Sequence, residues 1–182
     1  ETNLVLSDQT ISLNPGTYRG GINIKKNGKV TFKPGIYIIK DGPLLTKNQS
    51  IATGNGVTFY FTGVGSRFSF DGTTEISFKA PENGPTAGLL FFQDPAASAG
   101  AIFEIDSKRA AYLLGTIYLP NGTLSIRAKN KVAEASAYTV IVARKIKVGV
   151  TTEMHINANY GATAVPVPAG LGPQTGKARL LN

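Results

Sequence analysis

The feature that most constrains the fold is a short internal repeat near the start of the chain. Ile11-Ser12-Leu13 returns as Val30-Thr31-Phe32, and Pro15-Gly16-Thr17-Tyr18 returns as Pro34-Gly35-Ile36-Tyr37, both with the same offset. A repeat near twenty residues is typical of solenoids, in which each repeat forms one coil that stacks on the next. The sequence therefore predicts a column of similar coils.

The same short triplet recurs farther along the chain. It appears as Val57-Thr58-Phe59 and as Ile76-Ser77-Phe78, which are separated by the same offset as the first two copies. The step from Val30 to Val57 is longer than either of these. We therefore expect one coil between Val30 and Val57 to carry a longer loop.

The residue types favour strands over helices. Each triplet alternates apolar and polar residues, which on a strand turns two side chains inward and one outward. Each Pro-Gly pair marks a corner, because proline cannot donate to a ladder and glycine accepts unusual backbone angles. The pattern predicts an all-β, single-domain β-solenoid, specifically a right-handed parallel β-helix. A compact β-sandwich is the alternative, since the second half of the chain is less regular.

The 182 residues are enough for one domain with a sizeable core. We expect residues 1–182 to form a single β-helix domain, with residues 1–10 as an N-terminal cap or lead-in strand. Residues 162–176 are rich in proline, glycine and alanine and are predicted to be irregular, and residues 177–182 to form a final strand. The apolar run Leu89-Leu90-Phe91-Phe92 is typical of a strand covered on both sides by other layers.

The net charge of +8 gathers in two regions. Six lysines and one aspartate lie between residues 25 and 47, and six basic residues and one glutamate lie between residues 127 and 147. Such regions attract anionic partners, although lysine is also common at outward strand positions, where it protects sheet edges. The candidate binding residues are Lys25, Lys26, Lys29, Lys33, Arg127, Lys129, Arg144, Lys145 and Lys147.

The composition excludes several other classes. The chain has no cysteine, so it has neither disulfides nor thiolate chemistry. No apolar run reaches the roughly 20 residues of a membrane span. The aromatic residues occupy mostly inward strand positions, so we expect no nucleic-acid partner, and nothing in the sequence calls for a cofactor or a metal.

Catalysis on a polysaccharide would need a pair of carboxylates. The candidate pairs are Asp71 with Glu75 and Glu104 with Asp106. The second pair is spaced i and i+2, so that both side chains can face one side of a strand beside Lys108 and Arg109. A solvated strand with local ion pairs explains the same pattern.

Two further residues are candidates for a site. Asp94 follows the Leu89 run and is interpreted as a cap or turn residue of one helical turn. His155 is the only histidine. It alternates with apolar neighbours, which indicates an outward strand position, and the sequence offers no partners for a catalytic triad or a zinc site. We therefore expect no enzymatic activity.

Several segments together resemble a known family. They are LNPGTYRGGINI, VTFKPGIYIIKDGPL, GVTFYFTG, ISFKAPENGPTAGLLFFQD, YLLGTIYLPNGTLSI and YTVIVARKIKV, in that order over residues 11–148. They are similar to the C-terminal extracytoplasmic region of TadG-like proteins of the tight-adherence (Flp) pilus assembly systems of bacteria. The resemblance implies a secreted or envelope β-rich module of pilus biogenesis or surface attachment. The family's N-terminal membrane anchor has no counterpart here, which suggests a processed fragment or a stand-alone relative.

The expected function is therefore a non-catalytic structural or adhesion module of the bacterial cell surface, in an extracytoplasmic location. Expected partners are other envelope or pilus-system proteins, a second copy of the chain, or an acidic polysaccharide. The alternatives are a polysaccharide-binding or polysaccharide-active β-helix, a self-stacking filament subunit, and an ice-binding β-solenoid, which the chain resembles in its Pro-Gly-x-Tyr corners. Ice binding needs regular threonine rows, whereas Thr31 and Thr58 are expected to neighbour Ile11, Ser12 and Ser77.

Overall fold

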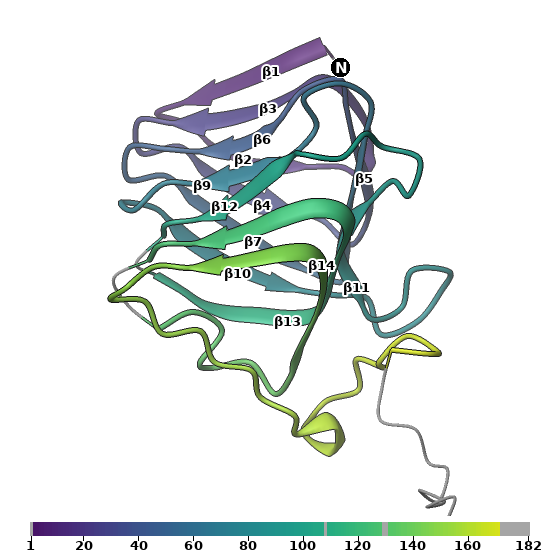
Figure 1. Ribbon diagram of the computed structural model, residues 1–182. Helices are drawn as coiled ribbons and strands as arrows, with labels where there is room; N and C mark the ends of the chain where they lie inside the picture. The colour runs from purple at the N-terminus through teal and green to yellow at the C-terminus, as the bar shows by residue number, and fades with distance from the viewer. Residues whose placement is uncertain (1, 108, 129–130, 172–182) are drawn as a thin grey trace, which may run out of the picture.

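The computed structural model describes residues 2–107, 109–128 and 131–171. These residues form a parallel β-solenoid of about six turns, in which 14 strands belong to one continuous hydrogen-bonded sheet (Figure 1). They include no α-helix and one 3-10 turn, Tyr160–Ala162. The predicted solenoid is confirmed, and the β-sandwich alternative is wrong because every pairing between the described strands is parallel.

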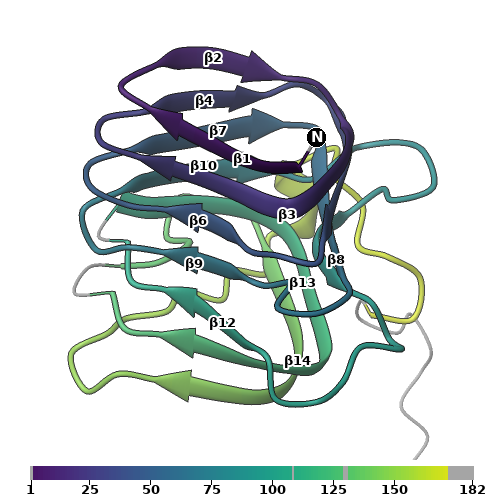
Figure 2. The same cartoon turned by 90° about the horizontal axis from the view of Figure 1, so that it is seen from above.

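The coils have three faces. The first face contains β1 (Thr2–Ser7), β6 (Leu44–Thr46), β9 (Phe68–Phe70) and β12 (Ile102–Ile105). The second face contains β2 (Thr10–Leu13), β4 (Lys29–Phe32), β7 (Ile51–Asn55) and β10 (Glu75–Lys79). The third face contains β5 (Gly35–Lys40), β8 (Val57–Thr62) and β11 (Leu89–Gln93). Figure 2 shows the strands of the second face side by side.

Three long strands continue around corners and so belong to more than one face. In β3 (Gly16–Lys25), residues 16–19 pair on the third face and residues 22–25 on the first. In β13 (Arg109–Ile126), residues 109–114, 115–119 and 123–126 lie on the second, third and first faces in turn. In β14 (Thr139–Val148), residues 139–143 and 145–148 lie on the third and first faces.

The strand register follows the sequence repeat at the start of the column. Ile11 pairs with Val30 on the second face, as the repeat predicts. Val30 then pairs with Ala52, which is a slightly longer step along the chain, and Ala52 pairs with Ile76. The prediction that Val57 continues this stack was wrong, because Val57 pairs with Gly35 on the third face. The long spacing between Val30 and Val57 therefore does not indicate a long loop. It arises because the two residues lie on different faces of the column.

The Pro-Gly-x-Tyr motif builds the corner between the second and third faces. Gly35 has φ +138°, and a Cβ there would lie 2.7 Å from the Pro15 side chain of the preceding coil. The tyrosine hydroxyls donate back to carbonyls four residues earlier, from Tyr18 to Asn14 at 2.6 Å and from Tyr37 to Lys33 at 2.8 Å. Each tyrosine therefore satisfies a corner carbonyl from inside the column.

Phenylalanine rings fill the middle of the column. Phe59 contacts Phe32 and Phe78 edge to face, both with ring centroids 5.0 Å apart. Phe68 lies 4.6 Å from Phe91 by the same measure, and all five side chains are fully buried or nearly so. Aromatic pairs in these geometries add about 0.5–1.5 kcal/mol beyond the burial of their area. The rings of Phe68 and Phe70 also point inward, with no exposed surface.

The outer side of the third face carries a row of aromatic residues. Phe92 stacks between Tyr60 and Tyr118, with ring centroids 5.3 and 5.4 Å away. All three are only partly buried. The prediction of a second layer over residues 89–92 was wrong for Phe92, because it lies on the outer surface of the sheet. Phe91 and Leu90 are both buried because the register shifts at β11.

The two ends of the column differ. At the N-terminal end, within the segment predicted as a cap or lead-in strand, β1 pairs with β3 and buries Leu6. After β14 the chain is held by isolated bridges, with Met154 opposite Val132 and Ala158 opposite Tyr138. Residues 163–171, which follow the 3-10 turn, belong to no helix or strand. The predicted final strand at residues 177–182, and residues 172–176, lie outside the described residues.

Candidate functional site

The carboxylate pair that the sequence singled out lies on the first face. Glu104 and Asp106, at the end of β12, flank Ile105, whose side chain is buried in the core. Because side chains alternate along a strand, the two carboxylates point outward together. In the stacked coils Glu104 lies between Ser69 and Ser125.

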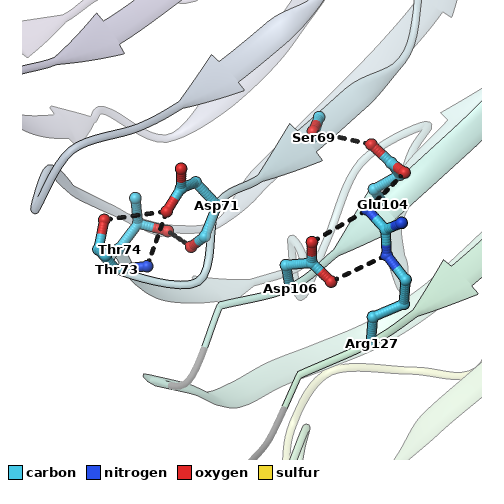
Figure 3. Close-up of polar contacts among 7 residues, drawn as sticks. All are labelled: Ser69, Asp71, Thr73, Thr74, Glu104, Asp106 and Arg127. Carbon is cyan, nitrogen blue, oxygen red and sulfur yellow. Dashed lines mark hydrogen bonds and ion pairs between the residues drawn. The ribbon is translucent and has the colours of Figure 1, made fainter. Parts of the chain in front are cut away.

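One arginine from the next coil binds both carboxylates. Ile105 pairs with Ile126, and this register brings Arg127 beside Asp106. The Arg127 guanidinium donates from Nε and Nη2 to Asp106 at 3.2 and 3.0 Å, and from Nη2 to Glu104 at 2.9 Å (Figure 3). The hydrogen bond to Asp106, followed by the charges of Asp106 and Glu104, raises the pKa of Arg127. The second oxygen of Glu104 accepts from the Ser69 hydroxyl at 3.2 Å.

The structure separates the other members of the predicted site. Arg109 lies at the start of β13 on the second face, 3.6 Å from Glu75 of β10. It therefore does not join Glu104 and Asp106, and Lys108 lies outside the described residues. Asp71 accepts from the backbone and hydroxyl of Thr73, at 2.8 and 2.9 Å, and turns away from Glu104 and Asp106 (Figure 3). Asp71 and Glu75 likewise do not form a pair.

The remaining site candidates have local structural roles. Asp94 accepts from the Thr62 hydroxyl at 2.7 Å and from the Ala96 backbone at 2.9 Å. These bonds, the one from Thr62 first, lower the pKa of Asp94. Its interpretation as a turn residue is confirmed, although the turn does not become helical. His155 lies near Glu153, with Nε2 3.7 Å from the carboxylate.

The candidate basic residues fall at opposite ends of the column. Lys25 lies on the first face in the second coil, Lys26 in the following corner, Lys29 on the second face and Lys33 at the next corner. In the later group, Lys145 and Lys147 lie on the first face of β14, preceded by Arg144 at its bend. Four coil steps of about 4.8 Å separate Lys25 from Arg127, which is about 19 Å.

Acidic residues lie between the two basic groups on the first face. These are Asp71, Glu104 and Asp106, in the intervening coils. The basic residues therefore form two separate patches, of which Arg127 is already engaged by carboxylates. Lys129 lies outside the described residues.

Two outward features escaped the sequence analysis. One is the aromatic row Tyr60, Phe92 and Tyr118 on the third face, whose signal was the alternation of these residues with buried ones. The other is Tyr112, an outward tyrosine of the second face that pairs in register with Ser77. Glu75 pairs with Arg109 but Ser77 pairs with Tyr112, so the register of β10 against β13 shifts between these two positions. The shift breaks the inward-outward alternation along β13 from which an outward Tyr112 could have been predicted.

Among the described residues, no three histidine, aspartate or glutamate side chains gather in a group that could hold a metal ion. In residues 2–107, 109–128 and 131–171, no helix has the length and hydropathy required to cross a bilayer.

The fold thus defines the class of the protein, which is a parallel β-solenoid. Comparison of the chain with family models, with curated proteins and with solved structures finds no match. The resemblance to TadG-like proteins therefore stays a prediction.

Proposed function

We propose that this protein is a non-catalytic structural or adhesion module of the bacterial cell surface, associated with pilus assembly or surface attachment. In this proposal the protein acts outside the cytoplasm. Its partners are envelope or pilus-system proteins, further copies of itself, or surface polysaccharide.

The observation that carries the proposal is the arrangement of Glu104, Asp106 and Arg127. Glycoside hydrolysis needs two carboxyl groups that flank the bond to be cleaved, one of them available as a proton donor. Here the two carboxylates project side by side from one strand and share one guanidinium at 2.9–3.2 Å. This arrangement ties one coil to the next, which favours a scaffold over a hydrolase.

The architecture supports the same proposal. Backbone hydrogen bonds between coils and a column of buried rings give a rod whose faces are fixed relative to one another. Such a rod presents outward side chains at a regular spacing of about 4.8 Å. An attachment module needs a persistent surface of this kind rather than a closing active site.

The test measures attachment of the protein to cells and hydrolysis of surface polysaccharide in the same experiment. Fluorescent beads coated with the protein are washed over bacteria that carry tight-adherence pili and over the same strain without the pilus genes. We expect more retention on piliated cells than for albumin-coated beads, with no release of reducing sugar from surface polysaccharide. Retention equal to albumin on both strains, or steady release of reducing ends, would contradict the proposal.

A further inference from the structure

A groove of about 790 Å³ lies on the second face toward the C-terminal end of the column. Its floor is formed by β10 and the first part of β13, which pair in parallel. Residues 131–134 and 151–153, from the two following coils, contribute its wall. The groove therefore forms where a flat solenoid face meets the less regular last coils, away from the Arg127 cluster on the first face.

Four of the polar side chains of the groove form two oppositely charged pairs. Arg109 lies 3.6 Å from Glu75, and Lys131 lies 2.8 Å from Glu134. The hydrogen bond from Lys131 lowers the pKa of Glu134. These four side chains remain 41–61% exposed, so their unused donors and acceptors are open to a ligand.

The charges that line the groove favour a neutral ligand over an anionic one. Three carboxylates, those of Glu75, Glu134 and Glu153, face the two permanent cations Arg109 and Lys131. An anionic ligand gains no net attraction there. A neutral ligand with many hydroxyl groups can accept from the cations and donate to the carboxylates, and such charge-assisted hydrogen bonds are stronger than neutral ones.

An aromatic ring completes the site. Tyr112 is the aromatic residue among the groove lining. It takes part in none of the ring contacts found among the described residues, whereas Tyr118 on the same strand stacks on Phe92. The Tyr112 ring is half-buried and packs in part against the core, and the remainder of the ring can receive an apolar surface such as the C–H face of a pyranose.

A row of hydroxyl side chains leads into the groove along the second face. Ser12, Thr31, Thr53 and Ser77 are in register on β2, β4, β7 and β10. The expectation that Thr58 belongs to this row was wrong, because Thr58 is fully buried on the third face. The row offers hydrogen bonds to a chain longer than the groove.

We propose that this groove binds a neutral oligosaccharide, with Tyr112 under a sugar ring and with Arg109 and Glu75 bonded to its hydroxyls. The inference rests on the proposed attachment role and names the class of ligand that the protein attaches to. It differs from attraction of an acidic polysaccharide by the basic patches, because the groove has no excess of positive charge.

The test is a titration of the full chain with cellohexaose and maltohexaose as neutral probes and with trigalacturonic acid as an acidic one. Binding is followed by calorimetry and by backbone amide shifts. We expect at least one neutral probe to shift residues 75–77, 109–112 and 131–134, with an affinity that changes less than about twofold between 0.05 and 0.5 M salt. We expect Tyr112→Ala to weaken binding by about tenfold or more.

Matched variants separate the site from general effects. Tyr118→Ala removes an outward tyrosine of the same strand on another face. Tyr118→Ala and Arg19→Gln, which changes an exposed arginine of the third face, are the controls and should leave the affinity within about twofold, whereas Arg109→Gln should weaken it by about fivefold. The circular dichroism and the melting temperature of every variant are compared with the parent, and the shift map of the parent protein tests the site without any substitution.

Several outcomes would overturn the inference. They are no binding of either neutral probe, binding of the acidic probe alone with steep salt dependence, or loss of binding in Tyr118→Ala but not in Tyr112→Ala. If beads still adhere to piliated cells when both neutral probes fail, the groove proposal falls and the attachment role stands. Cleavage of a bound probe would instead contradict the non-catalytic role.

Discussion

The middle of the column and its C-terminal end bury their inward apolar side chains to different extents. In the middle, rings from successive coils such as Phe59, Phe78 and Phe91 are completely buried. In the last coil, Ile146 and Val148 pair with the inward residues Leu124 and Ile126, yet they are 47% and 52% exposed. An inner coil has a neighbour on both sides, whereas these residues are covered on one side by described residues.

The last coils replace apolar stacking with specific polar contacts. The Asn157 side-chain amide donates to the carbonyls of Ala133, Glu134 and Ser136, the last at 2.8 Å. The Tyr138 hydroxyl donates to Pro166 at 2.6 Å. A solenoid of this kind gains stability from each interface between coils. The rigid middle is therefore the scaffold, and the irregular end supplies the groove.

The largest effect is expected from opening a cavity in the middle. Phe91→Ala should lower the free energy of unfolding by about 3–5 kcal/mol, because a fully buried ring leaves a space that the surrounding rings cannot fill. Chemical denaturation measures the loss. The neighbouring Phe92→Ala, on the outer surface, should cost much less. Equal losses for the two variants would show that the buried stack has no special role.

The dependence of stability on alkaline pH tests the buried tyrosine Tyr138 in the last coils. Burial, and to a lesser extent Tyr160, raises the pKa of Tyr138 from 10 to about 12. The folded state therefore holds this proton more tightly, so the stabilisation is complete below pH 10 and is lost as the pH rises toward 12. Between these values the parent should lose about 2–3 kcal/mol more of its unfolding free energy than Tyr138→Phe.

Denaturation midpoints at pH 9, 10, 11 and 12 measure the alkaline effect. Tyr160→Phe is the matched control and should lose stability with pH as the parent does. If Tyr138→Phe and the parent lose stability in parallel, the raised pKa of Tyr138 is contradicted.

Asn157 tests how far one side chain holds the last coils. Asn157→Ala leaves three backbone carbonyls without this donor and should cost about 1–2 kcal/mol. Asn159→Ala is the control, since only the backbone of Asn159 contributes a hydrogen bond there. Limited proteolysis after residue 150 should accelerate in the first variant only. Unchanged proteolysis in Asn157→Ala would contradict the role of this amide.

The smallest effect is expected at the exposed inward positions of β14. Ile146→Ser should change the unfolding free energy by no more than about 0.5–1 kcal/mol, because nearly half of the side chain is already in water. Ile126→Ser, which changes a fully buried isoleucine of the same face, should cost several times more. A large loss for Ile146→Ser would mean that something covers this end of the column in solution.

The repeat predicted the solenoid because its strands and corners have short sequence patterns, namely the alternating triplets and the Pro-Gly pairs. Ile11 and Val30 stack as expected, and the Pro-Gly pairs form corners. The face of Val57 was mistaken because an apolar-polar-apolar triplet suits any face of a coil. The length of each coil depends on its corners, and the coil from Val30 to Ala52 is longer than the one from Ile11 to Val30.

Only the part of the site that lies on a single strand could be predicted from the sequence. The common side of Glu104 and Asp106 follows from their spacing on one strand. Their contact with Arg127 depends on the coil step that relates Ile105 to Ile126, and no short motif records that step. Tyr112 was missed for a similar reason, since its groove is assembled from four coils and its strand register contains a shift.

The most direct test of the account is hydrogen–deuterium exchange of the full chain, with and without the neutral hexasaccharide that binds best. We expect slow exchange in β5, β8 and β11 in both states, because these strands carry buried rings of the core and exchange only on global unfolding. We expect residues 131–134 and 151–155 of the free protein to exchange faster than these middle strands, because they lie in the less regular last coils, and to exchange more slowly when the sugar is bound. Uniform protection along the chain, or slowing confined to the first face, would contradict a rigid column that carries a groove at its end.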